Sequence, residues 1–201
     1  MQPITSLSDL HALYGTPKEA ATRKVTSSLT PTYRAWIARS RFCILSTVGP
    51  DGTDGSPRGD DDPVVRVIDD RTIALPDWRG NDRIDTLRNI VRDGRISLLF
   101  LIPGSSNAMR INGRAIVTAD QQLINQFDRR TERPRSVIVI QIAEVYSQCA
   151  RAIIRSALWT SGDQSTGLPT VGQMLAEITK GDFDGATYDA EWPDRARKTM
   201  W

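Results

Sequence analysis

Histidine and cysteine are scarce in this sequence, which has one histidine, His11, and two cysteines, Cys43 and Cys149. The cysteines are far apart and neither belongs to a C-x-x-C pair, so we expect neither a metal site nor a disulfide framework. A site that needs two imidazole groups is excluded by the single histidine. Cys149 lies in an apolar segment, and we expect it to be a small buried side chain.

The common nucleotide-binding and hydrolase motifs are also missing. The sequence has no G-x-G-x-x-G, no G-x-x-x-x-G-K-[ST] and no G-x-S-x-G. These absences argue against a dinucleotide fingerprint, a P-loop and a nucleophile elbow.

No apolar run approaches the roughly 20 residues that span a bilayer, so we expect no membrane partner. The start, MQPITSLSDLHALYG, has no basic stretch followed by an apolar one, so we expect no secretory signal and a cytoplasmic protein. Twenty-six basic and 24 acidic residues are interspersed, with a net charge of +2. This balance does not indicate a nucleic-acid surface. Residues 1–201 are long enough for one globular domain.

Hydrophobic patterning predicts a mainly β chain between two less regular ends. Residues 1–40 are expected to be helical, and residues 160–201 to form a helical and loop tail with a helix at 171–178 and a polar stretch after it. Further helices are expected at 83–91, capped by Asn81 or Asp82, near 119–127 and near 150–159. Strands are expected at residues 42–48, 53–60, 64–68, 72–75, 96–102, 108–118 and 137–146.

Six or seven strands in meander order favour a closed or nearly closed antiparallel barrel. The nearly continuous apolar run at 96–102 is typical of a strand that is buried on both faces or lies at an interface. Gly113, inside the strand at 108–118, predicts a bulge or a close approach of another backbone.

The segment around residues 75–89 has a pattern typical of a phosphate-binding site. A strand ends, a glycine-containing loop follows and a helix begins, and the unpaired N–H groups of a helix start stabilise a phosphate. Arg79 and Arg83 flank this loop, and Arg58 lies on an earlier strand. The alternative from the residues alone is a surface loop whose arginines pair with nearby aspartates.

Four segments in order carry a resemblance to a known family: GPDGTDGSPRGD, IALPDWRGNDRIDTLRNI, MRINGRA and VYSQCARAIIRSALW. Together they resemble the pyridoxamine 5′-phosphate oxidase-like, FMN-binding split-barrel proteins, especially the subgroup with P-D-x-x-G-N-x-R-x-D-T-L-x-N-I. The resemblance covers residues 42–159. It implies an antiparallel split β-barrel of six or seven strands with peripheral helices, FMN as cofactor, and a homodimer with FMN near the interface.

The resemblance also implies which residues contact FMN. Asn81 and Arg83 would hold the phosphate, although the oxidases proper have S-R-K where this sequence has Asn81-Asp82-Arg83. Arg58 would serve either the pyrimidine end of the ring or the phosphate. The full set is Arg58, Gly59, Leu75, Pro76, Asp77, Asn81, Arg83, Met109, Arg110, Arg155, Ser156 and Trp159.

The function that this resemblance favours is an FMN-dependent oxidoreductase acting on a small molecule, with NAD(P)H as a possible donor. One alternative is an FMN-binding or sensing protein with little turnover. Another is a split barrel that holds a deazaflavin or haem, and haem is disfavoured because His11 lies outside the barrel segments. The sequence identifies neither the substrate nor a catalytic residue.

Overall fold

One antiparallel sheet of seven strands forms the centre of the computed structural model, which describes residues 1–127 and 132–200. All seven predicted strands are confirmed, with shifted ends. The bounds are β1 (Phe42–Gly49), β2 (Gly52–Gly59), β3 (Arg66–Val67), β4 (Thr72–Asp77), β5 (Arg95–Leu101), β6 (Ala108–Thr118) and β7 (Ser136–Gln148).

The expected meander order is only partly right. Short connections do join β1 to β2, β3 to β4 and β5 to β6 as antiparallel neighbours, and a longer connection joins β6 to its neighbour β7. The sheet order, however, is β2-β1-β5-β6-β7-β4-β3. The chain leaves β4, crosses over through α4 (Asp85–Arg92) and enters the sheet again beside β1. A helix in this connection lets two strands that are adjacent in sequence lie far apart in the sheet.

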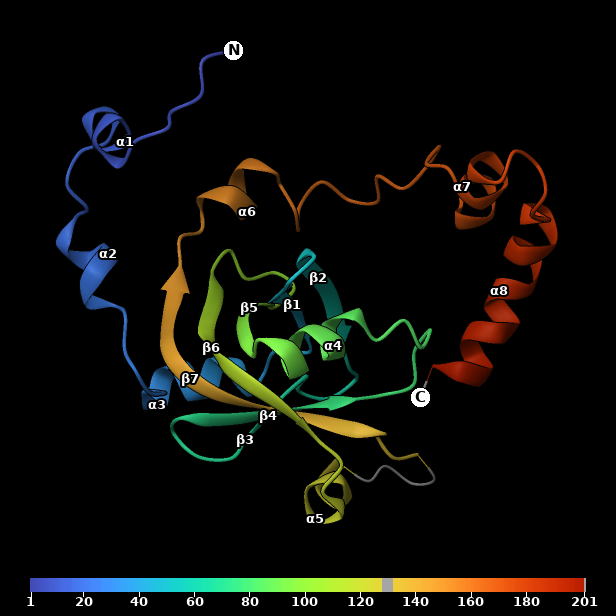
Figure 1. Ribbon diagram of the computed structural model, residues 1–201, viewed down its shortest axis with the longest axis horizontal. Helices are drawn as coiled ribbons and strands as arrows, with labels where there is room; N and C mark the ends of the chain where they lie inside the picture. Colours follow the sequence, from blue (N-terminus) through green and yellow to red (C-terminus); the bar gives the residue numbers. More distant parts are fainter. Residues whose placement is uncertain (128–131, 201) are drawn as a thin grey trace.

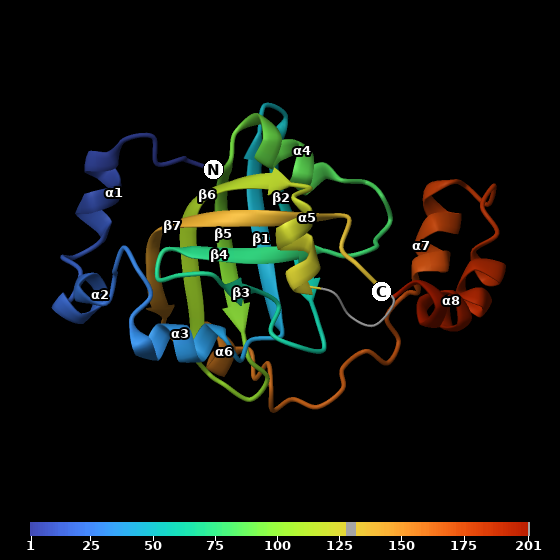
Figure 2. The ribbon, with the colours of Figure 1, turned by 90° about the horizontal axis from the view of Figure 1, so that it is seen from below.

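The two longest strands, β6 and β7, bend and so take part in both halves of the barrel (Figures 1 and 2). The β6–β7 register shifts between Asn112 and Gly113, which confirms the predicted bulge. A Cβ atom on Gly113 would lie 2.1 Å from the backbone oxygen of Gln141. The close approach is therefore to the neighbouring strand, and only glycine fits there.

Alternate strand residues fill the barrel, as in β1, where Cys43 and Leu45 are fully buried and Phe42 and Ser46 are exposed. Burial raises the pKa of the Cys43 thiol to about 12, with Arg58 opposing the shift. Such a thiol stays protonated and unreactive near neutral pH. Cys149 lies just beyond the end of β7 and is exposed, so the expectation that it is buried was wrong.

The N-terminal region is not one helical segment. It contains three short helices, α1 (Leu7–Leu13), α2 (Glu19–Arg23) and α3 (Pro31–Ile37). Gly15 and Pro17 lie between the first two and interrupt the helix. Thr30 caps α3 with Pro31 at its first position, and Tyr33 and Trp36 pack on the barrel core.

The predicted helix at 171–178 is confirmed as α7 (Val171–Ile178), but the following stretch is not merely polar. It contains α8 (Gly185–Thr199), which Asp184 caps through the N–H of Thr187. Between the barrel strands lie α5 (Gln121–Ile124) and the 3-10 turn η1 (Asn125–Phe127), and α6 (Arg151–Arg155) follows β7. None of the helices in the described residues is long and apolar enough to cross a membrane.

Replacing Gly113 with alanine tests the bulge. Gly113→Ala should lower the free energy of unfolding by about 2–4 kcal/mol, because the new methyl group would collide with backbone that cannot move aside cheaply. Gly55→Ala on β2 is the matched control, since a Cβ atom there meets nothing within 4 Å. Urea denaturation of both variants measures the difference, and equal stabilities would show that the bulge does not require glycine.

Candidate functional site

A cleft of about 1010 Å³ lies between β2, the end of β4 and the start of α4. A volume of this order suits a small-molecule cofactor. The structure brings seven of the twelve residues predicted for the FMN site to its walls. They are Arg58, Gly59, Leu75, Pro76, Asp77, Asn81 and Arg83.

The barrel side of the cleft is formed by alternate residues of β2. Asp54, Ser56 and Arg58 pair with the inward-facing residues of β1, so their side chains lie on the barrel side of the strand, where they are half-buried. The strand thus presents a carboxylate, a hydroxyl and a guanidinium group to one cleft. The residues between them have their side chains on the opposite face.

An ion pair joins the two sides of the cleft floor. Arg58 Nη1 lies 2.6 Å from Asp77 Oδ1, and the two side chains are 20% and 17% exposed. Four strands separate β2 from β4 in the sheet order, so this contact forms only because the sheet curls round. Arg58 Nε is buried without a hydrogen-bond partner among the described residues. Buried donors are rarely left unpaired, which makes this atom a candidate contact for a bound group.

The loop from residue 78 to residue 84 has an unusual backbone. Asp82 and Ile84 adopt left-handed conformations, with φ of 59° and 52°. A β-branched residue rarely adopts this conformation, and each such residue costs about 1–2 kcal/mol. Strain of this kind persists where surrounding contacts hold the chain in place, and it is frequent at binding sites.

The helix after this loop begins at Asp85, two residues later than predicted, and the predicted cap is wrong. Ile84 occupies the cap position and no side chain accepts from the first N–H groups. The Asn81 amide oxygen accepts instead from the N–H of Arg83, at 3.1 Å. Asp82 pairs with Arg135 at 2.7 Å. The N–H groups at the start of α4 therefore face the cleft without a side-chain cap.

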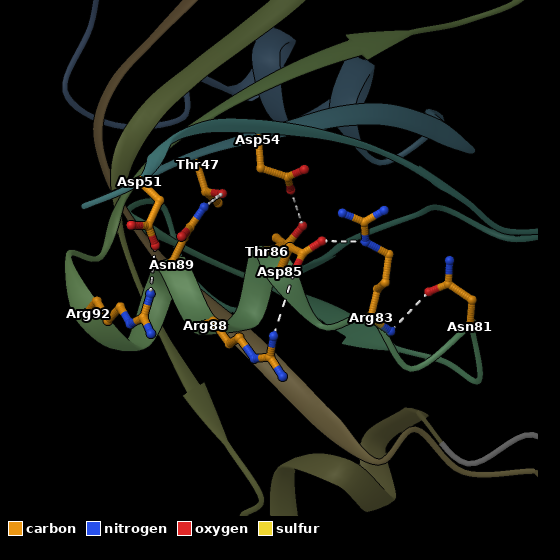
Figure 3. Close-up of polar contacts among 10 residues, drawn as sticks. All are labelled: Thr47, Asp51, Asp54, Asn81, Arg83, Asp85, Thr86, Arg88, Asn89 and Arg92. Carbon is orange, nitrogen blue, oxygen red and sulfur yellow. Dashed lines mark hydrogen bonds and ion pairs between the residues drawn. The ribbon is translucent and has the colours of Figure 1, made fainter. Parts of the chain in front are cut away.

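The alternative of ion pairs within the loop is also seen in the structure. Arg83 Nε lies 2.7 Å from Asp85 Oδ2, and Arg88 approaches the same carboxylate at 3.9 Å (Figure 3). These pairs are exposed, with the Arg83 side chain 80% accessible. An exposed pair contributes only about 0–1 kcal/mol, so it can give way to a phosphate. Ion pairing and phosphate binding by the same arginine are therefore compatible.

Three polar contacts fasten α4 to the β1–β2 hairpin (Figure 3). The hydroxyl of Thr86 donates to Asp54 at 2.6 Å, and the amide of Asn89 donates to Thr47 at 3.1 Å. Arg92 adds a longer contact of 3.5 Å to the hairpin turn. Thr86, Asn89 and Arg92 follow at intervals of three, which places them on one side of the helix. This row fixes where the helix start lies relative to β2.

The other five predicted site residues do not line this cleft. Met109 is buried in the barrel core, and Arg110 lies beside Tyr146, 3.4 Å from its hydroxyl. Arg155 and Ser156 are exposed at the end of α6, and the Trp159 indole donates to the backbone of Ser105 at 2.7 Å. Within one chain, seven of the twelve predicted site residues therefore lie together in the cleft, and the other five lie elsewhere.

Several cleft residues were missed from the sequence. The alternation along β2 would have indicated Asp54 and Ser56, and the three-residue spacing on α4 would have indicated Thr86. No local signal points to Arg135 or to Met200, which come from the start of β7 and the end of α8. These five residues all line the cleft.

The family assignment comes from a comparison with known families. The family model described as pyridoxamine 5′-phosphate oxidase matches residues 29–149, more than half of the chain. This chain belongs to the pyridoxamine 5′-phosphate oxidase family. The match includes β1 to β7 and both sides of the cleft, so the site lies within the part of the chain that defines the family. No curated protein matches the sequence.

Solved structures with a similar fold are also known. HupZ from Group A Streptococcus has 18% identity over 60% of this chain and 94% of its own, with a TM-score of 0.51. A putative pyridoxamine 5′-phosphate oxidase from Lactobacillus delbrueckii has 24% identity over 60% and 95% of the two chains, with a TM-score of 0.48. The similarity to HupZ supports the split-barrel fold that the sequence predicted.

The buried contact between Thr86 and Asp54 can be tested by substitution. In this member of the pyridoxamine 5′-phosphate oxidase family, Thr86→Val should lower the free energy of unfolding by about 1–3 kcal/mol, because a half-buried carboxylate loses its donor. Thr86→Ser retains the hydroxyl and serves as the control. Urea denaturation gives both values, and a valine variant as stable as the serine variant would contradict the assigned role of this contact.

Proposed function

We propose that this chain binds FMN in the cleft between β2, β4 and α4 and works as an FMN-dependent oxidoreductase. The observation that carries the proposal is the convergence of seven predicted contact residues from two strands and the loop before α4 in one cleft. Membership in the pyridoxamine 5′-phosphate oxidase family supports the choice of a flavin over other phosphate-bearing ligands.

The phosphate of FMN would lie at the outer end of this cleft, beside the start of α4. Arg83 and Arg135 carry exposed guanidinium groups there, and each forms an ion pair with an exposed carboxylate, Asp85 and Asp82 respectively. Guanidinium groups bind phosphate in a bidentate manner, and the uncapped N–H groups of α4 add partial positive charge. The backbone N–H of Arg83 is already bound by Asn81, so the Arg83 side chain is the group that would bind.

The ring would lie deeper, against Leu75 and Pro76, which are both buried at the end of β4. Arg58 is held beside it by Asp77 and has a buried Nε atom available to donate. A positive group fixed at this depth stabilises negative charge on a bound ring without having to reorganise. Bound FMN supplies the electron or hydride transfer itself.

We further propose that the active form is a homodimer with FMN near the interface. On the outside of the barrel, the paired strands β1 and β5 carry four apolar side chains: Phe42, Ile44, Leu99 and Leu101. Phe42 is 37% exposed, and the other three are half-buried. An apolar strip on this face is typical of a subunit contact. Such a contact would let Arg110, Arg155, Ser156 and Trp159 serve the site of a partner.

A second candidate is an FMN-binding protein with little turnover. It is favoured by one observation: the side chains that line the cleft include no histidine, cysteine, lysine or tyrosine among the described residues. Proton transfer at the site would then fall to aspartates or to water. The experiment below separates the two candidates.

Purified full-length chain should bind added FMN at micromolar concentration, with quenching of the flavin fluorescence. NAD(P)H added without oxygen should then bleach the flavin absorbance, and air should restore it. Binding without bleaching by either NADH or NADPH would favour the second candidate. Failure to bind FMN would overturn both.

Arg83→Ala should weaken FMN binding by about 1–3 kcal/mol, which corresponds to a Kd about 5- to 150-fold higher. The control is Arg95→Ala, because Arg95 makes a similarly exposed ion pair with Asp93 but does not line the cleft. Fluorescence titration of both variants measures the effect. The same Kd in Arg83→Ala as in the unmodified chain would remove Arg83 from the phosphate site.

A further inference from the structure

The two ends of the chain form arms that extend from the barrel. The N-terminal arm, residues 1–25, contains α1 and α2, and neither helix has a buried residue. Its exposed side chains are nevertheless apolar in large part. They include Ile4, Leu7, Leu10, Leu13 and Tyr14, of which Leu7 is 73% exposed.

The C-terminal arm, residues 168–200, is a rigid unit formed by α7 and α8. Gly172 and Gly185 touch so closely that a Cβ atom on either would lie 2.1 Å from the other's backbone oxygen. The Asp189 carboxylate of α8 accepts hydrogen bonds from the Thr170 hydroxyl and from the N–H of Gly172, the latter at 2.9 Å. These contacts join α7 directly to α8 within the arm.

This arm also exposes an apolar row. Val171, Met174 and Ile178 follow one another along one side of α7, and Ile178 is 77% exposed. Trp192 on α8 is 53% exposed. A contiguous exposed apolar patch is typical of a protein interaction site.

The arms lie on opposite sides of the barrel, as both views show (Figures 1 and 2). The apolar face of one arm therefore cannot be covered by the other arm of the same chain. A two-fold axis perpendicular to the line between the arms exchanges the two sides. It places the N-terminal arm of one protomer beside the C-terminal arm of its partner, twice in each dimer.

The net charges of the arms are opposite in sign. The N-terminal arm, residues 1–25, contains three basic side chains and two acidic ones. The C-terminal arm, residues 168–200, contains six acidic side chains and four basic ones. Opposite charge beside an apolar contact favours pairing of an N-terminal arm with a C-terminal arm over pairing of two identical arms.

We propose that the chain forms a dimer by reciprocal arm exchange, in which α1 and α2 of each protomer cover the apolar row on α7 of its partner. The inference rests on the dimer proposed above. Met200, at the end of the C-terminal arm, lines the cleft. The exchange would therefore bring the partner's N-terminal arm close to the cleft mouth and couple dimer formation to the site.

Mixed cross-linking tests the exchange. In a Cys149→Ser background, chains carrying Leu10→Cys and chains carrying Ile178→Cys are mixed and treated with a bismaleimide. The mixture should give a covalent product of twice 22.3 kDa. Each variant alone should give none, because two like arms do not meet. Ser8→Cys with Glu177→Cys is the control, because neither residue belongs to the apolar rows of α1 and α7, and it should give less product than Leu10→Cys with Ile178→Cys.

A second variant measures the energetic contribution of the contact. Ile178→Glu should raise the dimer Kd at least about tenfold, because a carboxylate would enter an apolar contact, whereas Glu177→Gln should leave the Kd unchanged. Ile178 is exposed in the single chain, so folding is retained. No product from the mixture, equal product from either variant alone, or a monomer by light scattering would overturn the exchange. FMN content is measured on the same samples, so that loss of flavin binding is detected separately.

Discussion

The attachment of α4 to the β1–β2 hairpin is the interaction on which the cleft depends. Thr86 is 4% exposed, and its hydroxyl bonds to the carboxylate of Asp54 on the cleft wall. A hydrogen bond to a charged group of this kind contributes about 1.5–3 kcal/mol, similar in size to the strain of one left-handed residue. With Asn89 as a second attachment, the helix holds Asp82 and Ile84 in their unfavourable conformations. The Asp82–Arg135 ion pair is a further contact that holds this loop.

The curl of the sheet supplies the other half of the site. Gly113 lets β6 and β7 bend, and the bend carries β4 around the barrel until Asp77 meets Arg58 on the opposite edge. The cleft therefore forms where the curled sheet brings β2 and β4 together, and not in a surface loop alone. This arrangement places the Arg58 guanidinium deep in the cleft and those of Arg83 and Arg135 at its exposed end. In the proposed complex, Arg58 would lie beside the flavin ring and the other two arginines beside the phosphate. The proposed chemistry depends on both ends being occupied by the same molecule.

Much of this could be predicted from the sequence, because the relevant signals are local. Period-two patterning located the strands, Gly113 indicated the bulge, and the strand–loop–helix pattern after Leu75 indicated the cleft. What failed depends on long-range packing. The meander order is broken between β4 and β5 since the chain crosses over through α4, and the predicted α4 cap was wrong since two left-handed residues delay the helix. Arg135 joined the cleft through the pairing of β7 with β4, which no nearby residue signals.

The C-terminal helix α8 is another feature that depends on packing and could not be predicted from the sequence. Its polar sequence and Pro193 gave no amphipathic pattern, and α8 packs on α7 through the close Gly172–Gly185 contact and the hydrogen bonds of Asp189. Five of the predicted site residues lie outside the cleft, and Met109 is among the buried core residues. In the homodimer that we propose, the exposed residues at the end of α6 would reach a flavin only in the cleft of a partner.

The most direct test of the central claim compares the affinities of the full-length chain for FMN and for riboflavin, which differ only by the phosphate. Equilibrium fluorescence titration at one fixed ionic strength gives both Kd values. The account predicts much tighter binding of FMN, with the difference reduced in the Arg83→Ala variant. Equal affinity for the two flavins, or a preference that Arg83→Ala leaves intact, would contradict a phosphate site at the start of α4.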